Sequence, residues 1–222
     1  MRLHTVFITY NRLDLTKISV ESYLETVTVP HTISIVDNHS EDGTQDWIMS
    51  KADLFYSHHL LRENRYPGFA CNLGFSRAPR EATFLQRADN DFRFLPDWCA
   101  EVKRRFVDPK IGQLGLRTPP EEQWASNNVG GNSIFRRELW DQGLRYEEKP
   151  WSEYPPGWSE DSLISPEVKK MGYEWRRVKR PCIESLASGD LNDPYYVKSY
   201  GDRGIIDPKV HGMRLGIVRD PD

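Results

Sequence analysis

Acidic residues stand at the ends of three expected secondary-structure elements. Asp37 closes one β-branched run, Asp89 and Asp91 close another, and Glu160 and Asp161 open a helical segment. In open α/β sheets, ligands bind outside the carboxyl ends of the strands. We therefore expect the acidic clusters to converge on one crevice if these segments belong to one parallel sheet.

The spacing of Asp89 and Asp91 suits a divalent cation. Carboxylate oxygens on a loop match Mg²⁺ or Mn²⁺, which keeps positions open for substrate phosphates. The alternative is an acidic turn, because Asn and Asp are favoured turn residues. Asp37 likewise either starts an Asx turn or accepts a hydrogen bond from a nucleobase or a ribose hydroxyl. Asp161 is either a general base or a helix-capping acid, which the helix dipole stabilises by about 0.3–1 kcal/mol.

Two further segments have two interpretations each. The aromatic residues Trp151, Tyr154 and Trp158 either stack on sugar rings or fill a gap beneath a surface loop. The basic stretch over residues 169–180 is either a solvated face or a contact for an anionic substrate or for lipid headgroups.

The sequence lacks the motifs of several other enzyme classes. The sequence has no P-loop, no G-x-G-x-x-G and no G-x-S-x-G, and its six histidines show no H-x-x-x-H spacing. Its three cysteines include no C-x-x-C pair, so neither a disulfide framework nor a zinc site is expected. The absence of a P-loop and of G-x-G-x-x-G disfavours nucleotide hydrolysis and nicotinamide chemistry.

The elements that must position the acidic residues alternate between strand and helix. A strand over residues 6–10, a helix over 13–25 and a strand over 32–36 predict a βαβ unit with a right-handed crossover. Residues 130–135 indicate a loop entering a strand, and residues 150–158 a surface loop. The remaining expected helices cover residues 44–51, 70–80, 98–106, 137–142 and 166–171, and the remaining strands cover 54–56, 82–86, 111–116 and 173–178.

The composition indicates a folded protein of ordinary domain size. Of the 222 residues, 38% are hydrophobic and 12% aromatic, and disordered chains lack such an aromatic load. A net charge of −3 disfavours nucleic acid as a partner. The sequence contains no run of 18 apolar residues and no signal-peptide pattern. Because the cysteines also fit a reducing compartment, we expect a cytoplasmic location. We expect no transmembrane segment, so any contact with a membrane would be peripheral.

Six motifs in this order resemble those of the family 2 glycosyltransferases. The resemblance extends over residues 4–180, and six motifs in the correct order are more specific than any one of them. The motifs are VFITYNR at 6–12, IVDNHSEDGT at 35–44, NRYPGFACNLG at 64–74, DND with LPDW at 89–98, GGNSIFRR at 130–137 and WSED at 158–161, the last followed by MGY at 171–173.

The resemblance implies the GT-A fold, an α/β architecture with a Rossmann-like, mostly parallel sheet flanked by helices. It also implies an inverting glycosyltransferase that uses a nucleoside-diphosphate sugar and Mn²⁺ or Mg²⁺. We expect a single domain over residues 1–222, with a nucleotide-sugar-binding half at 1–95, an acceptor-side half at 96–180 and an irregular tail at 181–222. The expected acceptor is a hydroxyl of a glycan, a protein or a lipid-linked group.

The resemblance implies a role for each residue that matches a family motif. Asp161 is expected to be the general base, with Glu160 as its like-charged neighbour. Asp91, together with Asp89, is expected to hold the metal. The nucleotide sugar is expected to contact Thr9, Tyr10, Asn11, Arg12, Asp37, Arg65, Asp89 and Asn90, and the acceptor is expected to contact Trp158 and Gly131.

The sequence departs from the family pattern in three places. The strand before Asp89 ends in Gln86-Arg87-Ala88, where the pattern is aliphatic. Ser165-Pro166 interrupts the helix that is expected after the Glu-Asp pair. No histidine stands at residues 183–186, where many relatives supply a metal ligand, so Glu184, His211 or water is the expected substitute.

Two other functions are weighed against the transferase. A sugar-phosphate nucleotidyltransferase has a related architecture, but its Gly-rich loop after the first strand is replaced here by YNRL at residues 10–13, without glycine. A catalytically inactive module that binds nucleotide sugars or glycans does not need both Asp91 and Asp161, and this sequence has both. We therefore expect the transferase.

Overall fold

The protein alternates strands and helices from its first residues onward. The computed structural model describes residues 1–117, 128–155 and 158–187. Its strands are β1 Leu3–Thr9, β2 His31–Asp37, β3 Ser57–Leu60, β4 Phe84–Asp89, β5 Phe92–Phe94, β6 Ile111–Gly115, β7 Ser133–Arg136, β8 Glu174–Arg177 and β9 Ile183–Ser185. Its helices are α1 Leu13–Thr26, α2 Thr44–Ser50, α3 Tyr66–Ser76, α4 Trp98–Arg105, α5 Arg137–Asp141 and α6 Glu160–Lys170, with 3₁₀ turns at Ala52–Leu54 and Trp151–Glu153.

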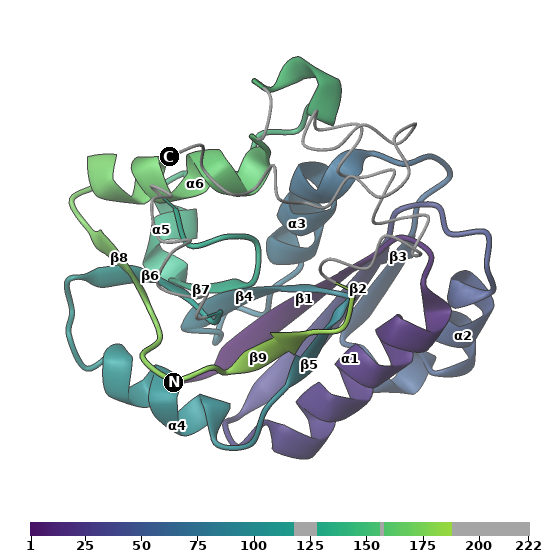
Figure 1. Ribbon diagram of the computed structural model, residues 1–222, viewed down its shortest axis with the longest axis horizontal. Coiled ribbons are helices and arrows are strands. Elements are labelled where there is room, and N and C mark those ends of the chain that lie inside the picture. The colour runs from purple at the N-terminus through teal and green to yellow at the C-terminus, as the bar shows by residue number, and fades with distance from the viewer. Residues whose placement is uncertain (118–127, 156–157, 188–222) are drawn as a thin grey trace, which may run out of the picture.

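Seven strands form one mixed sheet in the order β3-β2-β1-β4-β7-β6-β8, while β5 and β9 form a separate antiparallel pair (Figure 1). β1 pairs in parallel with β2 and β4, and β2 pairs in parallel with β3. β7 runs antiparallel between β4 and β6. The expected mostly parallel sheet flanked by helices is therefore confirmed.

The register brings the ends of three parallel strands to one edge of the sheet. Thr9 of β1 lies opposite Asp37 of β2, and Ile8 lies opposite Asp89 of β4. The loops that follow these strands therefore leave from the same edge, which is where open α/β sheets bind their ligands.

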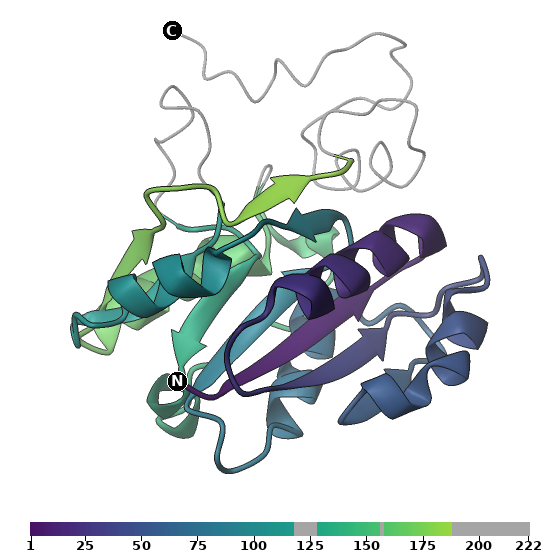
Figure 2. The ribbon, with the colours of Figure 1, turned by 90° about the horizontal axis from the view of Figure 1, so that it is seen from below.

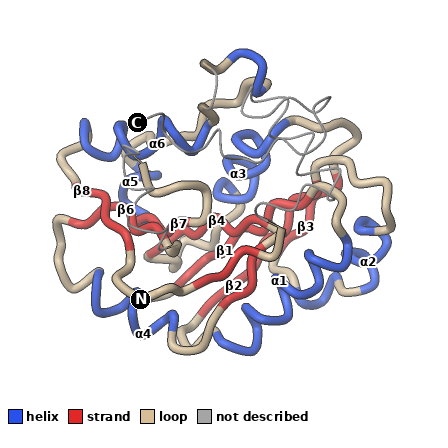
Figure 3. The backbone as a smooth tube through the Cα atoms, viewed as in Figure 1, coloured by secondary structure: helices blue, strands red, loops and turns tan. Residues whose placement is uncertain are grey.

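Alternate residues of β1 face two separate hydrophobic layers. Leu3 and Phe7 pack in a core with residues of α1 and α4, among them Tyr23. Val6 and Ile8 pack on the opposite face with residues of α3, α5 and α6. Figures 1 and 3 show α1, α2 and α4 below the sheet and α3, α5 and α6 above it. Because a buried side chain of this size contributes about 1.5–3 kcal/mol, both layers fix the sheet between the helices.

The β5–β9 pair connects the end of the described chain to the acidic turn after β4. Ile183 of β9 lies opposite Phe94 of β5, and the two strands run side by side in Figure 2. Leu186 N–H donates to the backbone oxygen of Asp91 at 2.8 Å. Part of the segment expected to be an irregular tail is thus a strand, while residues 188–222 lie outside the described residues.

Several boundaries differ from the predicted ones, among them those of β3, α3 and β4. The strand expected at 54–56 is instead β3, because residues 52–54 form a 3₁₀ turn. α3 begins at Tyr66 rather than at residue 70, with Pro67 in its first turn, where the missing N–H needs no partner. β4 continues to Asp89, so the first acid of the D-x-D motif is a strand residue.

The predicted break at Ser165-Pro166 is wrong. α6 runs continuously with Pro166 inside it. Ser159 and Ser162 form a capping box at its start, which satisfies backbone donors well before the helix start expected at residue 166. Ser165 Oγ donates to Gln113 Oε1 of β6 at 2.7 Å, so the helix is anchored to the sheet beside the residue that lacks a backbone donor.

The three cysteines are free and buried. Cys71 lies in α3, Cys99 lies in α4, and Cys182 directly precedes β9. Burial raises the pKa of each thiol, that of Cys182 to about 12. Among the described helices, none has the length and apolar character needed to cross a bilayer.

Candidate active site

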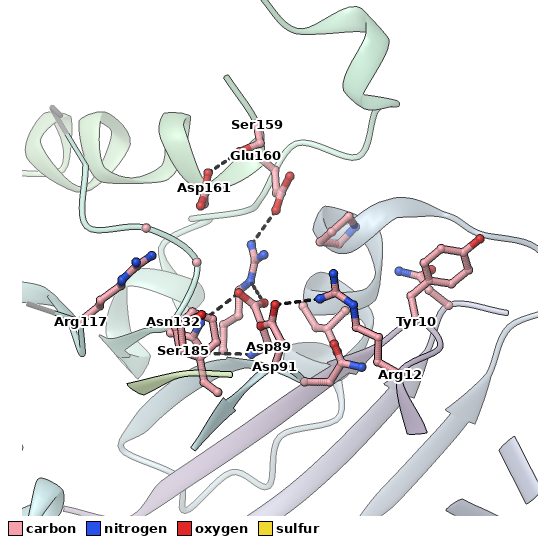
Figure 4. A pocket seen from close by; sticks show the side chains of 18 of the residues that line it. Tyr10, Arg12, Asp89, Asp91, Arg117, Asn132, Ser159, Glu160, Asp161 and Ser185 are labelled. Atoms are coloured by element: carbon pink, nitrogen blue, oxygen red, sulfur yellow. Dashed lines mark hydrogen bonds and ion pairs between the residues drawn. The ribbon is translucent and has the colours of Figure 1, made fainter. Parts of the chain in front are cut away.

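A cavity of about 310 Å³ opens at the carboxyl edge of the parallel strands. The loop after β1, the β4–β5 turn, the loop before β7 and the start of α6 form its walls (Figure 4). Two of the three acidic clusters line it, with Asp89 and Asp91 from one wall and Glu160 and Asp161 from another. The other polar lining residues are Tyr10, Arg12, Asn38, Asn64, Arg87, Asn90, Arg117, Asn132, Trp151, Ser159 and Ser185.

Asp89 lies between an arginine and an asparagine. Arg87 Nε donates to Asp89 Oδ1 at 2.9 Å, and Asn132 Nδ2 donates to Asp89 Oδ2 at 3.0 Å. Asn132 Oδ1 in turn accepts from the backbone N–H of Asp89 at 2.9 Å. Both carboxylate oxygens have a protein donor, so the side chain is held in one orientation at the cavity wall.

Asp91 lies in the turn between β4 and β5 and pairs with Arg12. Arg12 Nη1 donates to Asp91 Oδ2 at 2.8 Å. Burial and the nearby Asp89 carboxylate raise the pKa of Asp91 to about 6, and the Arg12 guanidinium opposes this shift. A further cation beside Asp91 would therefore favour its ionised form.

Asp89 and Asp91 are the residues that would hold a Mg²⁺ or Mn²⁺ ion, and phosphate oxygens and water would have to supply its remaining ligands. Both provide hard oxygen donors on one wall, and Mg²⁺ is commonly bound by one or two carboxylates together with substrate phosphates. In the part of the chain that the structure describes, no group of three or more His, Cys, Asp or Glu is placed to hold a metal. Glu184, an expected substitute ligand, pairs with Arg93 at 2.7 Å, and His211 lies outside the described residues.

The start of α6 places Glu160 and Asp161 in different surroundings. Glu160 is buried, with Oε1 accepting from Arg87 Nη1 at 2.8 Å and Oε2 accepting from Trp151 Nε1 at 3.2 Å. Asp161 is partly exposed, accepts from Ser159 Oγ at 2.5 Å, and points from α6 into the cavity in Figure 4. The Glu160 charge, which was expected to act on Asp161, is countered by the arginine.

The loop after β1 has two consecutive left-handed residues, Asn11 at φ 54° and Arg12 at φ 62°. Asn11 N–H donates to Ser40 Oγ at 2.6 Å, and Asn90 Nδ2 donates to the Asn11 backbone oxygen at 2.9 Å. These hydrogen bonds offset the cost of an unfavourable backbone. The resulting loop directs the Arg12 guanidinium toward the β4–β5 turn.

Asp37 is fully buried and does not line the cavity. Its Oδ1 accepts from Thr9 Oγ1 at 2.8 Å and from Ser40 Oγ at 2.5 Å, and its Oδ2 accepts from Ser40 N–H and from Gln45 Nε2, both at 2.8 Å. The side chain holds the turn that presents Asn38 to the cavity. Its contact with a nucleoside stays a prediction, as does that of Thr9.

Arg65 and Trp158 also lie outside the cavity lining. The Arg65 guanidinium carbon lies 3.9 Å from the centroid of the Phe69 ring, and the Trp158 side chain is exposed. Trp151, from the same aromatic segment as Trp158, lines the cavity instead. The binding roles of Arg65 and Trp158 stay predictions.

Among the cavity residues that were not predicted as site residues are Arg87, Arg117 and Asn132. A charged residue in a buried strand is a signal for Arg87. Asn132 directly follows the two glycines of the GGNS motif. Arg117 follows β6, and its guanidinium carbon lies 5.9 Å from the centroid of the Phe92 ring. No local pattern indicates that Arg117 reaches the β4–β5 turn.

We expect Asp37→Asn to lower the free energy of unfolding by about 2 kcal/mol. The amide offers one acceptor oxygen in place of two, so a buried donor loses its partner, which costs about 1–3 kcal/mol. Urea denaturation measures the change. Asp46→Asn, an exposed acid on α2, is the control, and equal effects of the two substitutions would contradict the role of Asp37 in the turn.

We expect Gly131→Ala to weaken metal-dependent binding of a nucleoside diphosphate about tenfold. An added Cβ would lie 2.7 Å from Asp89 Oδ2 and 2.9 Å from Arg87 Nη2, so both side chains must move, and overpacking of this kind costs about 1–3 kcal/mol. Gly130→Ala is the control, because its Cβ has open space and only its φ of 78° is strained. Gly130→Ala should lower stability without weakening the binding of the nucleoside diphosphate. Equal binding losses in the two variants would show that strain, not the displaced carboxylate, is responsible.

The fold is shared with solved structures. A mannosyltransferase from Pyrobaculum calidifontis, PcManGT in complex with GDP-Man and Mn²⁺, superimposes with a TM-score of 0.69 at 21% identity, over 91% of this chain and 60% of that one. S. aureus TarS 1–349 gives 0.66 at 15% identity, over 95% and 67%, and its complex with UDP-GlcNAc gives 0.62 at 15% identity, over 95% and 68%. The chain thus spans about three fifths of the length of the mannosyltransferase structure. The expected GT-A fold is confirmed.

The sequence also matches a protein family. The model for "Glycosyl transferase family 2" matches residues 5–142, which include most of β1, the β4–β5 turn and β7. The chain therefore belongs to glycosyl transferase family 2, the family that its sequence motifs resemble. A comparison with curated proteins gives no match.

Proposed function

We propose that the protein transfers a sugar from a nucleoside-diphosphate sugar to a hydroxyl acceptor, with inversion at the reacting sugar carbon. The observation that carries this proposal is the shared cavity, in which Asp89 and Asp91 come from the β4–β5 turn and Asp161 comes from α6. The carboxylates that would hold the cation for the leaving diphosphate and the carboxylate that would take a proton therefore lie on different walls (Figure 4).

The leaving diphosphate requires positive charge beside it. A bound divalent cation would supply this by neutralising the negative charge that develops on the leaving group. Asp91 is the proposed direct ligand, because both Asp89 oxygens already have donors from the protein. Arg12 and Arg117 bring two guanidinium groups to the same cavity, where they would bind phosphate oxygens.

Asp161 is the proposed general base for the attacking hydroxyl. Ser159 Oγ holds its Oδ1 atom, which orients the carboxylate. Glu160 is poorly suited to this role, because it is buried and both of its oxygens accept hydrogen bonds. An acceptor that approaches from the α6 wall would attack on the side opposite the leaving group, which gives inversion.

The residues predicted to bind the nucleotide sugar divide into two groups by position. Tyr10, Arg12 and Asn90 line the cavity and are proposed to contact the donor directly. Asn11 and Asp37 are buried and are proposed to act by holding the loops after β1 and β2. If Asp37 does contact the nucleoside, its substitution should weaken the binding of the bare diphosphate and of the sugar donor by similar factors.

The acceptor is proposed to be a hydroxyl of a glycan, a protein or a lipid-linked group, approached from the walls that contain Gly131 and α6. Trp151 adds an aromatic ring there, of the kind that packs on sugar faces. The complexes of PcManGT with GDP-Man and Mn²⁺ and of TarS with UDP-GlcNAc support a nucleotide sugar as donor. We place the reaction in the cytoplasm, which the three free cysteines support.

A panel of nucleotide sugars with Mn²⁺ or with a chelator tests the proposal. We expect one donor to stabilise the protein by about 2.7 kcal/mol at a hundredfold excess over Kd, and only with the metal. Transfer products with inverted anomeric configuration would support the mechanism, and retained configuration would contradict it. Donor binding without turnover would indicate an inactive binding module. Release of pyrophosphate from a nucleoside triphosphate and a sugar 1-phosphate would indicate a nucleotidyltransferase.

A further inference from the structure

The proposed mechanism leaves the buried cation Arg87 without a role. Arg87 lies in β4, and its side chain is only 5% exposed. Side chains alternate between the faces of a strand, so Arg87 shares a face with Leu85, which packs in the hydrophobic layer of α3, α5 and α6. A position of this kind is normally apolar, and a charged residue there requires partners.

Arg87 joins two elements that are 73 residues apart in the sequence. Its Nε donates to Asp89 Oδ1 at 2.9 Å, and its Nη1 donates to Glu160 Oε1 at 2.8 Å. One guanidinium therefore bridges the strand that ends in the D-x-D motif and the first residue of α6. The Tyr146 ring centroid lies 5.4 Å from the guanidinium carbon.

The loop before β7 packs directly against this bridge. A Cβ on Gly131 would lie 2.9 Å from Arg87 Nη2, so any larger residue there would have to displace the guanidinium. The two carboxylates have further partners of their own, Asn132 for Asp89 and Trp151 for Glu160. The guanidinium is thus enclosed, and its planar group of donors matches only one arrangement of the two carboxylates.

We propose that Arg87 is a positioning residue for the transfer, fixing the first turn of α6, and with it Asp161, relative to the acids of the β4–β5 turn. This inference rests on the proposed function. The base and the metal-binding carboxylates lie on different walls, so their separation depends on what connects the walls. A displacement of about 1 Å can reduce a rate by about 100-fold, whereas buried ion pairs often contribute little to stability compared with apolar side chains.

Arg87→Lys is the first test, because it keeps the charge but cannot form the planar bridge. We expect kcat to fall by about 10- to 100-fold. KM for the donor should change by less than about threefold, because Asn132 still holds Asp89 Oδ2. Hydrogen exchange should also rise in peptides that contain the first turn of α6. Arg93→Lys is the matched control, because Arg93 forms an exposed pair with Glu184 on the neighbouring β5–β9 strands. Arg93→Lys should change neither kcat nor hydrogen exchange in α6.

A double-mutant cycle tests whether Arg87 acts through Glu160. Once Glu160→Gln is present, Arg87→Lys should lower kcat much less than it does in the parent, because coupled residues are not additive. Independent, multiplicative losses would overturn the inference. The variant Arg87→Met with Glu160→Gln removes both charges together and avoids an unpaired buried carboxylate. It should fold with low kcat, and parental kcat in this variant would also overturn the inference.

The exchange measurement keeps this inference separate from the proposed function. It needs neither donor nor metal, so it reports the placement of α6 even in a protein that turns over no nucleotide sugar. Absence of turnover by the parent protein would contradict the proposed function alone. Unchanged exchange in α6 on Arg87→Lys would overturn the positioning role, whatever the parent catalyses.

Discussion

Asp161→Asn is expected to lower kcat by about 100-fold or more and to leave donor affinity nearly unchanged. Loss of a general base commonly costs 10²- to 10⁴-fold. A base acts on the acceptor proton in the transition state and contributes little to binding of the donor in the ground state, so the loss should appear in turnover. Initial rates and a separate donor-binding titration measure the two quantities.

Glu160→Gln is the paired control for Asp161→Asn. Glu160 is expected to act through position, so its variant should keep more of the parental kcat than Asp161→Asn does. If Asp161→Asn keeps parental turnover while Glu160→Gln abolishes it, the two roles are reversed. If neither loses activity, the mechanism proposed for this cavity is wrong.

Asp91→Asn is expected to remove most of the metal-dependent stabilisation by a nucleoside diphosphate. In the parent, saturation to a hundredfold excess over Kd contributes about 2.7 kcal/mol, or roughly 5–10 °C in Tm for a chain of this length. The substitution removes the proposed direct ligand and leaves Asp89, whose oxygens are already engaged by Arg87 and Asn132. Thermal shift with and without Mn²⁺ measures the difference.

The metal-free Asp91→Asn protein should be at least as stable as the parent. The folded-state pKa of Asp91 is raised to about 6, so the fold disfavours the ionised carboxylate. That cost is present at neutral pH and is lost progressively as the pH falls from about 6 toward the ordinary aspartate value of 3.8. Asp46→Asn on α2 is the matched control. The metal assignment fails if Asp91→Asn binds Mn²⁺ and the diphosphate as tightly as the parent.

The first βαβ unit could be predicted because its signals are local. The β-branched runs and the helical spacing between them give β1, α1 and β2 with boundaries close to the observed ones. The same reasoning placed two acidic pairs, Asp89 with Asp91 and Glu160 with Asp161, at the ends of expected elements, and both pairs line the cavity. Local pattern and long-range packing agree in these segments, so the sequence was sufficient. The boundaries themselves were less accurate, because β4 includes Asp89 and α6 begins well before residue 166.

Other features depend on contacts between distant residues, which no local pattern reveals. The partners of Arg87 include Glu160, 73 residues away, so the sequence showed an unusual charge but not its purpose. α6 passes through Pro166 because the Ser159 cap holds its start and the hydrogen bond from Ser165 anchors it to Gln113. Gln113 lies in β6, so this hydrogen bond joins segments that are distant in the sequence. β9 is a three-residue strand whose only signal is its pairing with β5.

The buried cysteines provide three built-in probes of local opening. Cys71 lies in α3, on the face of the sheet that contains the Arg87 bridge, while Cys99 lies in α4 on the other face. A thiol reagent reaches a buried cysteine only when the surrounding segment opens, so labelling rates would compare the stability of the two layers within one molecule. Because Cys182 directly precedes β9, its rate would show whether the pair formed by β5 and β9 opens with the rest of the domain or before it.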